Sequence, residues 1–142
     1  MNVTVEGAQV SIELVMPLDS VVGFERAPRT DAERKNAAAA LDRLRDGESL
    51  FRLDAAAQCR QASADIDAPV LTQPAAPAKG DHADLEARYV FRCAQPAALA
   101  SLDVALFDAF ARVERVQVQA VLAKGQRKAV LRKTNRVLKL AP

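Results

Sequence analysis

The chain has 142 residues, the size of one domain, with 50% hydrophobic and 27% charged residues and a formal net charge of +2. This is the composition of an ordinary globular protein, and no apolar run approaches the ~20 residues of a membrane-spanning helix, so we expect no membrane insertion. The chain begins without the basic and apolar segments of a signal peptide. We therefore expect either a cytosolic protein or a mature fragment that carries a new start methionine.

The small net charge conceals a strongly basic end of the chain. Residues 112–142 hold nine Lys or Arg and one acid, Glu114, and a segment of this kind can attract nucleic acid or an anionic membrane. The bases alternate with apolar residues, however, as on the solvated face of a strand, and the segment has no aromatic residue to stack on a nucleobase. We expect no nucleic-acid binding, and docking of these basic strands on an acidic partner stays open.

The first stretch, VTVEGAQVSIELVMP, alternates apolar and polar residues in two runs that meet at Glu6-Gly7. A period of two residues is the pattern of a β-strand, and the glycine between the runs predicts a hairpin. The next stretch, LDSVVGFERAP, predicts a loop that turns at Gly23 and Pro28.

The clearest helix is predicted for residues 31–46. Thr30 and Glu33 have the spacing of a capping box, and Gly47 is a typical residue just past a helix end. Apolar residues form one stripe and charged residues take the other side, which makes the helix amphipathic. The stripe consists of Ala37, Ala40, Leu41 and Leu44.

The rest of the chain reads mostly as strands. A turn or short helix precedes a strand over about 59–67, and the Pro/Ala-rich stretch that follows predicts an exposed, mobile loop over about 68–83. LEARYVFRC predicts the next strand, and the proline-led stretch after it fits either a strand with a short helix, which we favour, or one longer helix. The basic end predicts two or three antiparallel strands with turns at Lys124-Gly125 and Thr134-Asn135. Together these elements predict one α+β domain over residues 1–142, with mostly antiparallel strands in a sandwich-like arrangement.

The two cysteines lie at the start of the strand over 59–67 and at the end of the strand that follows. If these strands pair as an antiparallel hairpin, Cys59 and Cys93 meet at its open end, where a cross-strand disulfide has acceptable geometry. That register would place Phe91 opposite Gln61 and Tyr89 opposite Ser63. A bond between neighbouring sheets, or two buried free thiols, are the alternatives. A disulfide would indicate an oxidising compartment.

His82 is the only histidine, with Asp81 before it and Asp84 two residues after it. Side chains on an extended chain repeat every two residues, so His82 and Asp84 offer one nitrogen and one oxygen ligand on the same face. The hairpin would also bring Asp65 and Asp67 close to the neck of the loop, where a divalent cation such as zinc could bind. The alternative is a solvated polar loop edge, because zinc sites usually contain at least two histidines.

Patterns that indicate catalysis are absent from the sequence. A Ser-His-Asp arrangement would have to use His82, and no serine lies in a GxSxG elbow. There is no glycine-rich phosphate loop and no CxxC zinc spacing. We expect the protein not to be an enzyme.

Three blocks of the sequence, in order, resemble those of one protein family. LVMPLDSVVGFERAPRTDAER contains a Val-Gly-Phe-Glu and Ala-Pro block, HADL and YVFRC match an H-x-D motif followed by Y-x-F-x-C, and residues 96–110 match a P-x-x-L-x-x-L-x-V-x-L-F-x-x-F pattern. Over nearly its whole length the chain is similar to ZrgA-like proteins, the zinc-responsive periplasmic proteins of Gram-negative bacteria.

The resemblance implies a secreted, periplasmic, zinc-binding accessory protein that supports zinc uptake and is not an enzyme. Its implied partner is the periplasmic component of a zinc ABC importer, and the sequence sets no oligomeric state. The resemblance also implies the disulfide between Cys59 and Cys93. Carried over residue by residue, it assigns zinc to His82 and Asp84 of the H-x-D motif, with Asp81 and Glu25 as helpers.

The chain departs from the family pattern in three places. Members typically carry a histidine-rich segment before the first strand, whereas this sequence starts at the strand, so we expect a mature fragment without that segment. Members often carry histidines and acids in the middle loop, where this chain has APVLTQPAAPAKGD, and Arg26 stands where a histidine is common. These departures predict weak zinc binding by the 142 residues alone.

Overall fold

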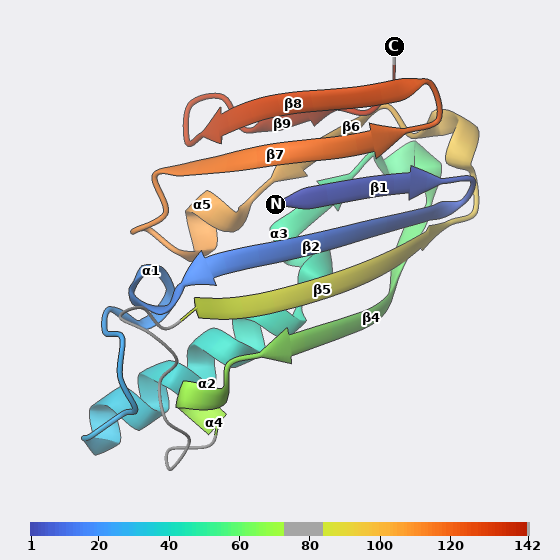
Figure 1. Cartoon of the computed structure of the whole chain (residues 1–142). Helices are drawn as coiled ribbons and strands as arrows, with labels where there is room; N and C mark the ends of the chain where they lie inside the picture. Colours follow the sequence, from blue (N-terminus) through green and yellow to red (C-terminus); the bar gives the residue numbers. More distant parts are fainter. Residues whose placement is uncertain (73–83, 142) are drawn as a thin grey trace.

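The computed structural model describes residues 1–72 and 84–141, and its strands form a six-stranded main sheet and a three-stranded small sheet (Figure 1). The strand order is β4-β5-β2-β1-β7-β8 in the main sheet and β3-β6-β9 in the small one. All paired strands are antiparallel except β1 and β7, which are parallel. The strands of the main sheet are β1 (Asn2–Glu6), β2 (Gln9–Pro17), β4 (Cys59–Asp67), β5 (Asp84–Cys93), β7 (Arg115–Leu122) and β8 (Gly125–Arg132); those of the small sheet are β3 (Phe51–Leu53), β6 (Ser101–Val104) and β9 (Val137–Lys139).

Helices and the small sheet cover one face of the main sheet (Figure 1). The longest helix, α2 (Asp31–Arg45), lies along β4 and β5, and the small sheet lies behind β7 and β8. The described chain has no helix that combines the length and apolar character needed to cross a bilayer. The predicted α+β class, with mostly antiparallel strands, is confirmed. The shorter helices are α1 (Leu18–Val22), α3 (Gly47–Leu50), α4 (Pro69–Thr72) and α5 (Leu106–Ala109), with 3-10 turns η1 (Ala55–Ala57) and η2 (Pro96–Ala98).

The alternation of apolar and polar residues along the strands determines which face of the main sheet is buried. The apolar residues Val10, Ile12, Leu14 and Met16, which alternate along β2, are all buried. Every second residue of β5 from Leu85 to Cys93 is buried with them. The intervening residues point to the opposite face, which carries mostly polar and charged side chains. One face of the main sheet therefore stays in water over most of its area.

Helix α2 forms where predicted and ends at Arg45, one residue earlier than expected. The Oγ1 atom of Thr30 accepts a hydrogen bond from the Glu33 backbone N–H at 3.1 Å, as the capping box requires. The predicted apolar stripe of four residues is buried. At its last turn the Leu44 carbonyl accepts a 2.5 Å hydrogen bond from the buried Tyr89 hydroxyl, which joins the helix to β5.

Gly47 follows the helix as predicted, but its role differs. It has no positive φ and begins α3. A Cβ atom at this position would lie 2.6 Å from Gln61 Oε1 and 2.7 Å from Tyr89 Cδ1. Close packing against β4 and β5 therefore requires the glycine.

Several short elements differ from the sequence prediction. The expected loop after β2 begins with α1, because Leu18, Val21 and Val22 have an apolar surface to bury. The expected mobile loop begins with α4, whose Leu71 is buried, and the rest of that predicted loop lies outside the described residues. The favoured strand and short helix after Pro96 are confirmed as β6 and α5. The last predicted strand, β9, pairs with β6 in the small sheet and so leaves the main sheet.

Candidate functional site

The predicted hairpin of β4 and β5 is present, and its two ends differ in chemistry. At the open end the pair Cys59 and Cys93 is joined by a disulfide with an S–S distance of 2.03 Å. The other end, here called the neck, is where β4 stops at Asp67 and β5 starts at Asp84. Cys59 lies roughly 26 Å along the strand from Asp67, so the cysteines take no part in chemistry at the neck.

The register of the hairpin is confirmed at the disulfide and shifts by one residue beyond it. Phe91 lies opposite Gln61 as predicted, but Tyr89 lies opposite Ala64 because an irregularity separates Gln61 from Ser63. A β-bulge of this kind places an extra residue on one strand. It keeps Ala64 and Ile66 on the half-buried inner side and sends Asp65 and Asp67 to the outer face.

Four exposed carboxylates gather on the outer face near the neck. Asp67 lies directly opposite Glu86, and Asp65 lies opposite Arg88. A cavity of about 200 Å³ is lined by these two pairs of residues together with Ile66. The fourth carboxylate, Asp84, is the first residue of β5 and lies opposite Pro17 of β2. Arg88 places a positive charge among the acids, which weakens the attraction of this face for a cation.

The outer-face carboxylates do not make a metal site by themselves. Within residues 1–72 and 84–141, no three His, Cys, Asp or Glu side chains converge in a way that could hold a metal ion. The structure therefore does not bring Asp65, Asp67 and Asp84 together as ligands of one ion. His82 and Asp81, the other predicted ligands at the neck, lie outside the described residues.

Glu25 lies in the segment between α1 and α2, at the same end of the main sheet as Asp84. Asp84 lies opposite Pro17, the last residue of β2. Helix α1 follows Pro17 directly, and Glu25 comes three residues after the end of α1. Its side chain is half-buried and is engaged in an interaction with its surroundings. Glu25 therefore lies toward the end of the main sheet at which the neck is found.

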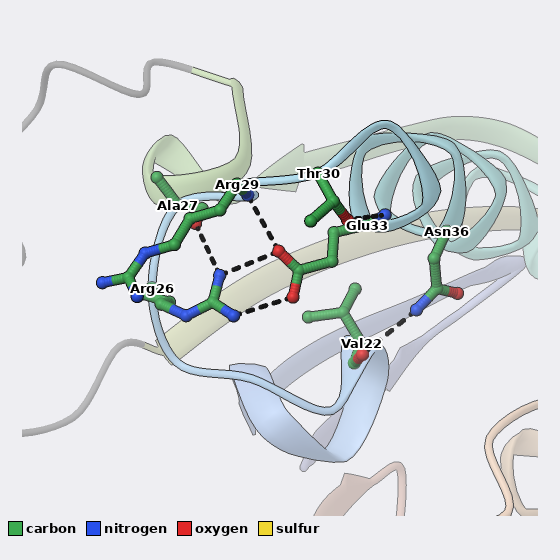
Figure 2. A network of polar contacts seen from close by, with 7 residues as sticks. All are labelled: Val22, Arg26, Ala27, Arg29, Thr30, Glu33 and Asn36. Atoms are coloured by element: carbon green, nitrogen blue, oxygen red, sulfur yellow. Dashed lines mark hydrogen bonds and ion pairs between the residues drawn. The ribbon is translucent and has the colours of Figure 1, made fainter.

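The residue after Glu25 holds this segment in place (Figure 2). The Arg26 guanidinium makes a two-pronged ion pair with Glu33, with N–O distances of 2.9 and 2.8 Å, and donates to the Ala27 carbonyl at 3.1 Å. It also lies 5.1 Å from the centre of the Phe24 ring. Arg26 thus joins the loop to the first turn of α2, and where the family often has a histidine this chain has a structural arginine.

The Glu33 carboxylate is the centre of that network. It accepts hydrogen bonds from Arg26 and from the Arg29 backbone N–H, the latter at 2.8 Å. These hydrogen bonds lower the pKa of Glu33 to about 2, and the bond from Arg26 has the larger effect. Asn36 ties the far side of the loop by donating to the Val22 carbonyl at 3.1 Å (Figure 2). The capping-box spacing identified Glu33, but no local pattern indicated its partner Arg26 seven residues away.

The chain matches a protein-family model. The model described as "ZrgA family zinc uptake protein" matches residues 1–140. A search of curated proteins found no match. The matched range includes the disulfide, the neck of the hairpin and the loop that carries Glu25.

Proposed function

Because this chain belongs to the ZrgA family of zinc uptake proteins, we propose that it is a periplasmic zinc-binding accessory protein that supports an ABC importer and has no enzymatic activity. The disulfide supports the proposed compartment, since disulfides persist in oxidising environments such as the periplasm. Zinc is the cargo in this proposal, and the importer's periplasmic component receives it.

The observation that carries the zinc role is the position of Asp84. It is exposed at the first position of β5, so a rigid strand presents its carboxylate at the neck, two residues after the only histidine. An imidazole nitrogen and a carboxylate oxygen are both ordinary zinc ligands. In this proposal His82 and Asp84 bind the ion, and Asp81 and Glu25 assist.

The same geometry makes the proposed site weak and open. The described carboxylates alone form no metal-binding group, so the site depends on His82 and completes its shell with water. A zinc ion with few protein ligands exchanges readily. That property suits a protein that passes its ion to an importer.

Zinc titration by calorimetry tests the proposal. We expect wild type to bind one zinc ion, and His82→Ala to lose about tenfold or more in affinity, at least the loss seen when a supporting contact of a metal ligand is removed. Asp84→Asn should lose affinity too, whereas Glu86→Gln, an exposed carboxylate on the same face, serves as the matched control. Equal affinity in wild type and His82→Ala, or no binding in either, would remove His82 from the site.

A second function, without metal, has its own observation. Arg115, Lys128 and Arg132 lie on the exposed face of β7 and β8, and Arg115 is directly opposite Arg132. Like charges opposite each other in a sheet repel, which an acidic partner would relieve. This function predicts salt-sensitive binding of an acidic partner that survives a chelator and is weakened in Lys128→Glu.

A further inference from the structure

The outer face of the main sheet, turned away from the helices and the small sheet (Figure 1), carries exposed side chains from all six strands. The strand pairing places six of them in one row straight across the sheet. The row consists of Asp65 on β4, Arg88 on β5, Glu13 on β2, Asn2 on β1, Gln119 on β7 and Lys128 on β8. It therefore begins with an acid at one edge of the sheet and ends with a base at the other.

The rows closer to the neck repeat this separation of charge. Asp67 lies directly opposite Glu86 at the acidic edge, and Arg115 lies directly opposite Arg132 at the basic edge. The register of β1 with β2 and β7 places both pairs on the neck side of the row that contains Asn2. Like charges opposite each other in a sheet repel. Each edge would therefore be stabilised by a surface of the opposite charge.

Apolar side chains are interspersed with these charges. Val15, Val121 and Val130 lie on the outer face and are 58%, 49% and 48% exposed, and they are three of the four large hydrophobic residues that are exposed in the described chain. Val90 on β5 is half-buried and lies in the same row as Val121. Exposed apolar residues surrounded by polar ones are typical of a surface that contacts another protein.

A second copy of the chain carries the complementary surface. Consider a two-fold axis that runs along the strands, between β1 and β2, in the plane where two outer faces meet. Rotation about this axis keeps each row at its level and exchanges its ends, so β4 of one copy lies over β8 of the other. Asp65 then faces the second copy's Lys128 in two equivalent contacts, and Val90 faces the second copy's Val121. Packed sheets lie roughly 10 Å apart, a distance that opposite charges on flexible side chains can close.

The size of the outer face also suits a dimer. Six strands about 4.8 Å apart and about 25 Å long present roughly 600 Å² from each copy, or about 1,200 Å² in total, the lower end of the range for stable interfaces. The separation of charge recurs in neighbouring rows, so it matches a second surface better than one extended segment of chain. Because the acidic and basic edges lie at the same level along the strands, the face is complementary to itself.

We propose that the outer face of the main sheet binds the same face of a second copy of the chain, in a two-fold dimer held by the charged edges and the exposed valines. The proposal rests on the second function above, docking of the basic strands on an acidic partner, and names that partner. It needs no metal. Each exposed ion pair contributes little and is screened by salt, so the dimer is reversible and salt-sensitive.

Sedimentation velocity of the full chain measures the dimer. The dissociation constant of wild type should rise about tenfold between about 50 mM and about 500 mM sodium chloride. Lys128→Glu and Asp65→Lys should each raise it about tenfold or more at low salt, because each change creates two repulsive contacts per dimer. Lys35→Glu makes the same change of charge on the exposed side of α2. It is the matched control and should leave the dissociation constant unchanged.

Mixing the two variants tests the arrangement itself. In a dimer of one Lys128→Glu chain and one Asp65→Lys chain, the new glutamate faces the new lysine at one contact, and the native acid faces the native base at the other. An equimolar mixture should therefore dimerise about as tightly as wild type. A mixture that stays as weakly associated as its components would overturn the proposal. So would a dimer that Arg60→Glu dissociates and Lys128→Glu does not, because the acidic edge would then face a different part of β4.

A second probe separates failure of the dimer from failure of the docking function. Fluorescein-labelled oligoglutamate, followed by anisotropy, reports on the basic strands alone. A wild type that stays monomeric but binds this probe, with loss of binding in Lys128→Glu, would overturn the dimer and retain docking on another acidic partner. A monomer that does not bind the probe would overturn both. A dimer that EDTA dissociates would overturn the metal-free interface.

Discussion

The two ends of the β4–β5 hairpin are built in opposite ways. At the open end a disulfide joins the strands, and the backbone continues the contact, with Ala94 N–H donating to Gln58 at 3.0 Å and Gln95 N–H to Ala57 at 2.9 Å. At the neck, exposed carboxylates face water and Arg88 lines their cavity. The disulfide at the open end stabilises the scaffold, and the proposed zinc site lies at the neck.

Removal of the disulfide tests that separation with the largest expected effect on stability. Cys59→Ser combined with Cys93→Ser should lower the free energy of unfolding by about 4 kcal/mol, since the bond closes a long loop in the unfolded chain. Guanidinium denaturation measures the change. Under conditions where the variant stays folded, zinc affinity should stay within about threefold of wild type, because the neck lies far from the bond. Loss of zinc binding as complete as in His82→Ala would show that the two ends are coupled.

The middle of the hairpin provides the next test. Tyr89→Phe removes the hydroxyl that bonds the Leu44 carbonyl and leaves that buried acceptor unpaired. We expect a loss of about 1–3 kcal/mol in unfolding free energy with zinc affinity unchanged. Thermal denaturation and zinc titration of the same sample check both parts. An unchanged melting temperature would mean that this bond does not hold α2 on the sheet.

The Arg26 and Glu33 pair contributes stability that depends on pH. Its arrangement lowers the pKa of Glu33 to about 2 from a usual value of 4.5. A carboxyl with a depressed folded-state pKa stabilises the fold above its unfolded pKa, and this contribution is lost as the pH falls from about 4.5 to about 2. Wild type should therefore lose more stability than Glu33→Gln between pH 6 and 3 in guanidinium denaturation. Parallel losses in the two proteins would contradict the network.

Substitutions at the neck should have the smallest effect on stability. Asp84→Asn and Glu86→Gln both alter exposed side chains, so each should change the unfolding free energy by no more than about 0.5 kcal/mol. Zinc affinity should distinguish them, falling in Asp84→Asn and holding in Glu86→Gln. A destabilised Asp84→Asn would assign this residue to the scaffold.

Local patterns predicted the elements that are determined locally. Alternation predicted β2, and the strand-like run that ends at Cys93 predicted β5. Cross-strand pairing of the two cysteines is one of the alternatives that the sequence leaves open, and the structure confirms it. The capping residues predicted α2. In each case the physical cause lies within a few residues of the element.

Features that depend on distant parts of the chain were missed. The parallel pairing of β1 with β7 and the transfer of β9 to the small sheet join segments that share no local pattern. The bulge before Ser63 has no signal in the local sequence pattern. The partnership of Arg26 with Glu33 requires the loop to fold back on α2. At the candidate zinc site the four ligands stay a prediction: the structure places Asp84 and Glu25 at one end of the main sheet, and Asp81 and His82 lie outside the described residues.

Because the chain has one histidine, its ring signals in a nitrogen-detected NMR spectrum belong to His82 without further assignment. The most direct test of the zinc role is to follow these signals while zinc is added at about pH 7.5. At this pH an imidazole is mostly neutral, so one ring nitrogen has no proton and can bind the ion. The account predicts that one ring nitrogen shifts strongly and that the change is complete near one equivalent of zinc. Zinc binding that leaves both ring nitrogens unshifted would contradict it.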